Sequence, residues 1–431
     1  MKRVGGEDME QKMSKIIVVG AGAAGLMAAI QAAIRGIAVL LLEKMPVPGK
    51  KILITGKGRC NFTNSCDLSE FTRHFPNNGM FLNSALRAFD NLDLIDFFSS
   101  HGVPAKVERG GRVFPESDQA RDIVKALVKC AQDAGVLIRT NQSVKSIHLN
   151  AGSVAAVVTE GEKFSAEAVI LATGGLSYPG TGSTGDGYRM AKELGHTVTP
   201  LRPALVPLET REPWVRDLQG LSLKNVEATV KVDGKKVDSE FGELLFTHFG
   251  LSGPIILSLS QAVSAMQKKV TPAVVTIEIN LKPALTHEML DKRLQRDFSA
   301  FTRKQFKNSL GELLPAKMIP VIVELSEIFP EKPVHQITKE ERVRLVELLQ
   351  NLKLTVSNTR PIAEAVVTSG GVSVKEINPK TMESRLIRGL FFAGEIIDVD
   401  GYTGGYNLQA AFSTGYVAGS AAAEWIAAAK K

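Results

Sequence analysis

The stretch that most constrains the fold lies near the N-terminus and reads SKIIVVGAGAAGLMAAIQAAIRGIAVLLLEK. It begins with an apolar run, Ile16 to Val19, that is rich in β-branched residues, as buried parallel strands are. Three closely spaced glycines follow, and then an alanine-rich helical run that Gly36 ends. A second apolar run over residues 38–42 completes a β-α-β unit. This unit predicts a parallel sheet covered by helices.

The three glycines stand in G-x-G-x-x-G spacing, which predicts a dinucleotide site. Gly20 permits the tight turn, Gly22 lets the backbone approach a pyrophosphate, and Gly25 lets helix and strand pack closely. The N–H groups and positive dipole end of the following helix then face the phosphates. Glu43, at the end of the second strand, is placed to accept hydrogen bonds from the ribose hydroxyls of the adenosine half.

FAD and NAD share this pattern, so later segments must decide between them. One is AEAVILATGG, residues 166–175, a buried strand that ends in Ala-Thr-Gly. The other, residues 389–419, contains a strand over 390–393, then Gly394-Glu395, then a polar loop. After that loop a Gly-Gly-Tyr-Asn sequence opens a helix that runs to about the C-terminus.

With these segments the chain resembles the two-dinucleotide-binding-domain flavoproteins. Within them it is most similar to the HI0933-like group of bacterial flavoproteins, often labelled NAD(FAD)-utilising dehydrogenases or bile-acid-reductase-like proteins. The resemblance covers nearly all of the chain from about Met13. The motifs that carry it are GKGRCNFTN (56–64), ATGGLSYPGTGSTGDGY (172–188), FTHFGLSGP (246–254), VTSGGV (367–372) and GEIIDVDGYTGGYNLQAAFSTG (394–415).

The resemblance implies a tightly but non-covalently bound FAD. Its ADP half would lie at the first glycines and Glu43, and Gly394-Glu395 would lie at the ribityl and pyrophosphate part. The late helix would point its N-terminus at the flavin pyrimidine ring, where reduced flavin carries negative charge. Residues 55–64 would run beside the ribityl chain and ring, the alternative being a surface loop with a buried free cysteine. The expected FAD contacts are Gly20, Gly22, Ala23, Ala24, Gly25, Glu43, Lys44, Thr55, Gly56, Arg59, Cys60, Asn61, Val144, Ala172, Thr173, Gly174, Gly394, Glu395, Asp398, Gly404, Gly405, Tyr406, Asn407 and Leu408.

The middle of the chain changes pattern and predicts an insertion into an α/β, Rossmann-like FAD-binding domain. VEATVKVDGKKV reads as a hairpin about Asp233-Gly234. Thr338 and Glu341 form a capping-box pattern before an apolar helix face. We expect a small β-barrel-like unit and a helical subdomain that cover the flavin face and shape a substrate pocket. The expected divisions are a disordered tail at 1–12 (with Met9 or Met13 as alternative starts), the FAD-binding domain at 13–203 and 361–431, the β-rich domain at 204–283 with its return strand at 351–360, and the helical subdomain at 284–350.

Two other patterns resemble functional motifs, one a second dinucleotide site and the other a redox disulfide, and each has a simpler structural interpretation. Residues 180–185 repeat the G-x-G-x-x-G spacing, but no strand immediately precedes them, so a loop leading into a helix over 186–194 is expected. Cys60 and Cys66 stand one residue further apart than the redox pair of flavin disulfide reductases. Free structural cysteines are therefore favoured, and a redox disulfide is the alternative.

Catalytic residues are not identified by the sequence. His248, which we expect in an apolar strand, and Tyr402, just before the late helix, are weak candidates for a proton donor. The sequence contains no Ser-His-Asp arrangement, zinc-ligand spacing or P-loop, so no metal is expected.

The composition limits the compartment and the kinds of partner that are expected. Three cysteines favour a reducing compartment such as the cytoplasm, and the longest apolar run is shorter than the roughly 20 residues of a membrane span. The net charge is +7, yet no run of five basic residues occurs, so nucleic acid is not expected and a small-molecule substrate is. The oligomeric state is left open.

The predicted function is an FAD-dependent oxidoreductase. The flavin would take hydride from transiently bound NAD(P)H and pass it to an organic acceptor such as a conjugated enone. The alternatives are a disulfide reductase that uses Cys60 and Cys66, an RNA-associated flavoprotein, and a flavin-binding protein without turnover.

Overall fold

The computed structural model describes residues 15–266 and 273–429. The predicted tail at 1–12, with the alternative starts Met9 and Met13, lies outside the described residues. The chain forms two units, of which the larger combines the residues up to Arg202 with those from Val366 onward. Pro203–Ala365 forms the smaller unit. Each unit has its own hydrophobic core.

The larger unit is built on a five-stranded parallel sheet in the order β19-β10-β1-β2-β6. Ile16 on the central strand β1 lies opposite Ala168 on β10 and Val39 on β2. Every residue of β1, β2, β10 and β19 is buried, as strands covered on both faces require. The predicted α/β, Rossmann-type architecture is therefore confirmed. The strands are β1 (Ile16–Val19), β2 (Val39–Leu42), β6 (Leu137–Arg139), β10 (Ala168–Leu171) and β19 (Leu390–Phe392).

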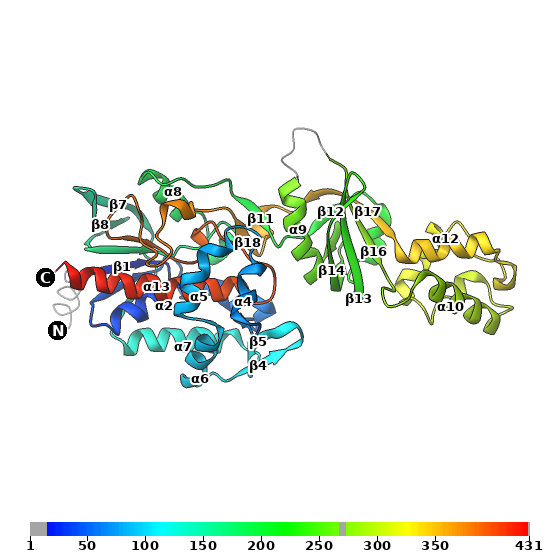
Figure 1. Cartoon of the computed structure of the whole chain (residues 1–431), viewed down its shortest axis with the longest axis horizontal. Helices are drawn as coiled ribbons and strands as arrows, with labels where there is room; N and C mark the ends of the chain where they lie inside the picture. The colour runs from blue at the N-terminus through cyan, green and yellow to red at the C-terminus, as the bar shows by residue number, and fades with distance from the viewer. Residues whose placement is uncertain (1–14, 267–272, 430–431) are drawn as a thin grey trace. The chain divides into compact units, whose positions relative to one another are not determined.

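Two helices from opposite ends of the chain pack together beside this sheet (Figure 1). They are α2 (Ala23–Ala33), which follows β1, and α13 (Tyr406–Ala428), near the C-terminus. A Cβ atom at Gly415 would lie 2.3 Å from the Ala24 carbonyl oxygen. One at Gly419 would lie 2.2 Å from the Ala28 oxygen. The two helix backbones therefore touch, and only glycine fits at these positions of α13.

Smaller elements surround the sheet in the larger unit. Two three-stranded antiparallel sheets, β3-β5-β4 and β7-β8-β9, flank it. Their strands are β3 (Thr63–Asn64), β4 (Ala105–Glu108), β5 (Arg112–Pro115), β7 (Val144–Asn150), β8 (Ser153–Thr159) and β9 (Lys163–Ser165). Strand β18 (Val367–Ser369) also belongs to this unit. Its remaining helices are α3 (Lys50–Ile54), α4 (Leu68–Phe71), α5 (Asn83–Ala88), α6 (Asn91–Ser100), α7 (Ala120–Asp133) and α8 (Asp186–Glu193).

The smaller unit contains a closed six-stranded barrel, β12-β15-β14-β13-β16-β17. Val232 pairs with Lys235, so β13 and β14 form the hairpin predicted about Asp233-Gly234. Thr338 and Glu341 form the predicted capping box at the start of α12. The barrel strands are β12 (Leu208–Thr210), β13 (Ser222–Val232), β14 (Lys235–Phe246), β15 (Gly250–Ser252), β16 (Val275–Asn280) and β17 (Leu352–Thr359). A further strand, β11 (Arg202–Ala204), precedes them in the sequence. The helices are α9 (Pro254–Met266), α10 (His287–Ala300), α11 (Ile319–Leu325) and α12 (Lys339–Gln350).

Two features that bear on function are missing from the described part of the chain. None of its helices is long and apolar enough to cross a bilayer. Within the same residues, no three His, Cys, Asp or Glu side chains stand together in a way that could hold a metal ion.

Candidate cofactor site

The three glycines of the first motif differ in whether the fold leaves room for a side chain. A Cβ atom at Gly20 would lie 2.6 Å from the Ala172 carbonyl oxygen, and one at Gly25 would lie 1.8 Å from the Gly20 oxygen. Gly22 has an ordinary φ of −83°, and a Cβ there would meet no atom within 4 Å. The fold therefore needs Gly20 and Gly25, whereas the space beside Gly22 suits a ligand that approaches the backbone.

Helix α2 begins at this space without a side-chain cap. Its first N–H groups and dipole therefore favour an anion, as a pyrophosphate site requires. Gly394, which has a φ of +77°, lies against the same helix start, because a Cβ there would be 2.8 Å from Ala24 Cβ. The structure thus brings together two predicted contacts that are about 370 residues apart in the sequence.

Glu43 is buried at the end of β2 and makes two short hydrogen bonds. Its Oε2 accepts from the Ala21 N–H and its Oε1 from the Met45 N–H, both at 2.7 Å. The carboxylate therefore holds the glycine turn in place. A carboxylate has about four acceptor sites, so two remain for ribose hydroxyls. Val144 begins β7 next to this edge, since the nearby Gln142 N–H donates to the Glu43 carbonyl oxygen at 2.9 Å.

The second glycine-rich motif packs over the end of β2. The Lys44 Nζ donates to Asp186 Oδ2 at 2.6 Å and also to the Thr184 hydroxyl. A Cβ atom at Gly182 would lie 2.9 Å from Met45 Cγ. The motif leads into α8 at Asp186, as predicted for a loop without a strand before it. Its role is therefore to cover the Glu43-Lys44 end of the first β-α-β unit.

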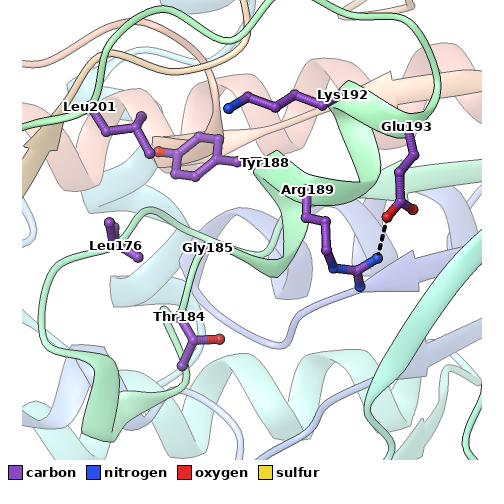
Figure 2. Close-up of a pocket in the computed structure, with 8 residues that line it drawn as sticks. All are labelled: Leu176, Thr184, Gly185, Tyr188, Arg189, Lys192, Glu193 and Leu201. Carbon is purple, nitrogen blue, oxygen red and sulfur yellow. Dashed lines mark hydrogen bonds and ion pairs between the residues drawn. The ribbon is translucent and has the colours of Figure 1, made fainter.

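A cavity of about 390 Å³ lies behind this loop, lined from α8 and its flanks (Figure 2). The Tyr188 ring and the Lys192 side chain point to the same side of α8 (Figure 2). Arg189 points to a different side, where its guanidinium group pairs with Glu193 Oε1 at 2.8 Å. The Tyr188 hydroxyl donates to the Glu395 carbonyl oxygen at 3.1 Å. Burial raises the pKa of Tyr188, so its hydroxyl keeps its proton and holds the Glu395 turn.

Residues 55–60 form a strained loop. Lys57 and Cys60 have φ angles of +58° and +64°, which side chains other than glycine rarely adopt. The Arg59 guanidinium donates to Asp118 Oδ1 at 2.8 Å and pairs with Glu108, and it lies 4.2 Å from the Phe114 ring centre. Flavin contact by Arg59 stays a prediction, but its charge is already neutralised by two carboxylates. The structure gives Arg59 a second role, fastening the loop to β4 and β5.

The neighbours of Arg59 in this loop are also used by the fold. Asn61 Oδ1 accepts from the Val113 N–H at 3.1 Å. Cys60 is fully buried, and burial raises its pKa to about 12. Cys60, Cys66 and Cys130 are free thiols.

Glu395 is the centre of a polar network that the sequence did not reveal. Its Oε2 accepts from Lys51 Nζ at 2.6 Å, while its Oε1 accepts from Ser177 Oγ at 3.0 Å and from the Thr368 N–H at 2.8 Å. Lys51 Nζ also donates to Ser177 Oγ at 2.8 Å. Four segments of the chain meet here, beside the predicted contact Gly174. No local pattern could predict Lys51, since it lies 344 residues from Glu395.

The start of α13 is held against β3. A Cβ atom at Gly405 would lie 2.2 Å from the Thr63 carbonyl oxygen. Asn64 Nδ2 donates to the Gly404 carbonyl oxygen at 3.0 Å, and Asn407 exchanges two 2.8 Å hydrogen bonds with the Gly401 backbone. No side chain caps α13, so its first N–H groups can meet the negative charge of a reduced flavin.

The ring of Tyr406, a predicted contact, lies against Gly404, because a Cβ atom there would be 2.8 Å from the ring atom Cε2. The ring is buried and stacks on His74, with ring centres 4.1 Å apart. Phe71 and Phe75 pack edge-on against it. Cofactor contact by Tyr406 stays a prediction.

Two carboxylates precede the helix tip: Asp400 is buried and Asp398 is half-buried. Burial raises the pKa of Asp400 to about 6, although Ser369 Oγ donates to its Oδ1 at 3.0 Å. Burial also raises the pKa of Asp398.

The two candidate proton donors lie in different units: Tyr402 in the larger and His248 in the smaller. His248 is exposed at a bend between β14 and β15, so its predicted place in an apolar strand was wrong.

Comparisons with known proteins identify the family of the chain. The HI0933-like protein Rossmann domain matches residues 14–421. The 3-dehydro-bile acid delta(4,6)-reductase of Clostridium scindens is 33% identical, over 96% of this chain and all of the relative. The ribosomal RNA dihydrouridine synthase of Escherichia coli is 34% identical, over 93% of this chain and 96% of the relative.

Among solved structures the likeness extends to the fold. A 3-ketosteroid delta1-dehydrogenase from Sterolibacterium denitrificans is 14% identical with a TM-score of 0.53, covering 95% of this chain and 99% of that one. A quinol-fumarate reductase is 18% identical with a TM-score of 0.51, covering 96% of this chain and 71% of that one.

Proposed function

The chain belongs to the HI0933-like family of FAD-dependent oxidoreductases, and from this premise we propose that it reduces a carbon–carbon double bond conjugated to a carbonyl group. NADH or NADPH would supply the reducing equivalents, and FAD would carry them as hydride to the substrate. The observation that supports the proposal is the pair of uncapped helix starts, since α2 could face the pyrophosphate and α13 the flavin ring.

Conjugation explains why such a double bond suits a hydride donor. The carbonyl group withdraws electrons from the alkene, so the alkene carbon farther from the carbonyl group can accept a hydride. The adjacent carbon then takes one proton, and the bond becomes saturated. The uncapped N-terminus of α13 would favour negative charge on a flavin ring bound beside it. The Tyr402 side chain, ahead of this helix, is our candidate for the proton donor.

The first candidate substrate is a small enone. The bile acid relative supports it, because its name describes a reduction in a 3-oxo steroid acid. The second candidate is uracil in RNA, whose ring double bond is also conjugated to a carbonyl group. Two relatives named ribosomal RNA dihydrouridine synthase, 34% and 33% identical, favour it, as does the net charge of +7.

The disulfide-reductase alternative finds less support. Thiol–disulfide exchange needs an accessible thiolate, whereas Cys60 is fully buried and its pKa is raised to about 12 by that burial. The free thiols of the described residues do support a reducing compartment such as the cytoplasm.

The test follows the visible absorbance of the flavin without oxygen. We expect NADH or NADPH to bleach the purified protein. We then expect 4-androstene-3,17-dione or a uridine-containing RNA to restore the colour, with the acceptor gaining two hydrogen atoms by mass spectrometry. A protein that neither nicotinamide bleaches would contradict the donor. If neither acceptor restores the colour, the substrate class is wrong.

A further inference from the structure

The hairpin of β4 and β5 has a feature that the cofactor site does not use. Its turn reads Arg109-Gly110-Gly111-Arg112, and both glycines have positive φ angles, +77° and +72°. Arg109 and Gly110 are exposed. Two guanidinium groups therefore flank a tight glycine turn, which we call the RGGR turn.

The RGGR turn is fastened next to the start of α13. Asn64 Nδ2 donates to the Gly110 and Gly404 carbonyl oxygens, each at 3.0 Å. The Ser65 N–H donates to the Gly111 oxygen at 2.7 Å. A Cβ atom at Gly111 would lie 2.4 Å from Asn64 Oδ1. One asparagine thus ties the turn to the loop from which the flavin-facing helix begins.

The rest of the hairpin is electrically balanced. Arg59 pairs with Glu108 and Asp118, and Lys106 pairs with Asp118 at 2.6 Å. These two cations and two carboxylates cancel. Glu116 lies beyond β5, at the base of the hairpin and away from the turn.

The two arginines of the turn are not balanced in this way. Among the described residues, neither Arg109 nor Arg112 forms an ion pair. The Arg112 Nε donates to the Arg109 carbonyl oxygen at 3.1 Å, which leaves its terminal nitrogens to other acceptors. Glu108 stands opposite Arg112 across the hairpin, and the pKa of its carboxyl is lowered by its hydrogen bond to Arg59 and also by the nearby charge of Arg112. The turn therefore carries two guanidinium groups outside ion pairs, of which Arg112 is partly offset by Glu108, beside the start of α13.

We propose that the RGGR turn is the anion-binding element of the substrate site and holds an oxyanion of the substrate. This inference rests on the proposed function, because the turn adjoins the predicted flavin end. Guanidinium groups bind phosphate and carboxylate oxygens with paired hydrogen bonds. The oxyanion is a backbone phosphate if the substrate is RNA and a side-chain carboxylate if it is a steroid acid. Such a contact positions the substrate and does not take part in bond making.

The RNA arm of the test measures binding without any electron donor. Arg109→Gln/Arg112→Gln protein is titrated into a fluorescein-labelled, uridine-rich RNA of about twenty nucleotides, between about 50 and 200 mM salt. We expect at least about tenfold weaker binding than wild type. The slope of log affinity against log salt should fall by about 1.4, because each phosphate contact to a single strand contributes about 0.7.

The steroid arm uses two enones that differ in charge. For 3-oxo-4-cholenoic acid, which carries a carboxylate, the double variant should raise Kd at least about fivefold. For uncharged 4-androstene-3,17-dione, Kd should not change. Lys163→Gln/Lys380→Gln is the matched control, since it removes two exposed lysines from β9 and from the turn after residue 378. This control should bind each probe like wild type.

The outcomes distinguish a phosphate from a carboxylate, and they distinguish failure of this inference from failure of the proposed function. Loss of RNA binding identifies a phosphate, and loss of binding to the steroid acid alone identifies a carboxylate. A double variant that binds RNA and the steroid acid as tightly as wild type would overturn the inference, as would wild-type protein that binds neither. If the arginines are needed for binding yet no substrate is reduced, only the proposed function is wrong.

Discussion

Replacing Gly419 by alanine is expected to lower the free energy of unfolding by at least about 3 kcal/mol, near the upper end for overpacked sites. The new Cβ atom would lie 2.2 Å from the Ala28 carbonyl oxygen, which belongs to backbone that no rotamer change can move. Helix α13 would have to separate from α2 along their contact. For a unit of this size the melting temperature should fall by roughly 6–12 °C, as measured by calorimetry.

Ser420→Ala is the matched control for this prediction. Ser420 is the next residue of α13, and its hydroxyl donates to the Tyr416 carbonyl oxygen within the same helix. Its replacement should change the unfolding free energy by no more than about 0.5 kcal/mol, as helix propensity predicts. A Gly419→Ala protein as stable as Ser420→Ala would show that the two helices do not touch.

Asp400 should make the protein more stable as the pH falls from neutrality. Burial raises the pKa of this carboxyl from an ordinary 3.8 to about 6, so the folded state binds the proton more tightly than the unfolded chain does. The resulting stability is fully present below pH 3.8 and is lost as the pH rises through about 6. Between about pH 7.5 and about pH 5 the gain should be about 1.4 kcal/mol.

The measurement compares Asp400→Asn with wild type in guanidinium unfolding at these two pH values. Asparagine cannot titrate, so the difference in unfolding free energy between the two proteins should change by that amount, with wild type gaining at the lower pH. Asp96→Asn, at an exposed site on α6, should follow wild type. A difference that does not depend on pH would mean that Asp400 is not buried as a raised-pKa acid.

The sequence predicted best what is encoded locally. The first β-α-β unit could be predicted because two strands, one glycine turn and one helix carry all of its signals within thirty residues. The hairpin about Asp233-Gly234 and the capping box at Thr338 were predicted for the same reason. In each case the backbone conformation limits which residues can stand at a few neighbouring positions.

What the sequence did not reveal depends on contacts between distant segments. Gly415 and Gly419 read as ordinary residues of an alanine-rich helix until α2 is placed against them. Lys51 carries no sign that Glu395 is its partner. Closure of the six-stranded barrel also needs β12 to pair with β17, about 145 residues later, which alternation along the chain cannot indicate.

Arg59 illustrates that residue type alone does not reveal the partners of a side chain. An arginine in a glycine-rich loop near a predicted flavin favours a phosphate or flavin contact. The structure adds Glu108 and Asp118, whose carboxylates pair with its guanidinium group. Arg112, on the neighbouring strand, belongs to no sequence motif, yet among the described residues it forms no ion pair, whereas Arg59 forms two. Charge balance in three dimensions therefore separates two arginines that a motif cannot.

Gly22→Val tests the central claim, that an FAD pyrophosphate lies over the start of α2. Because Gly22 has an ordinary φ and a Cβ atom there would meet no neighbour within 4 Å, the flavin-free variant should melt like flavin-free wild type. Its affinity for added FAD, measured by quenching of flavin fluorescence, should fall at least about a hundredfold, since valine would occupy the approach of the pyrophosphate. A Gly22→Val protein that binds FAD like wild type would contradict the account.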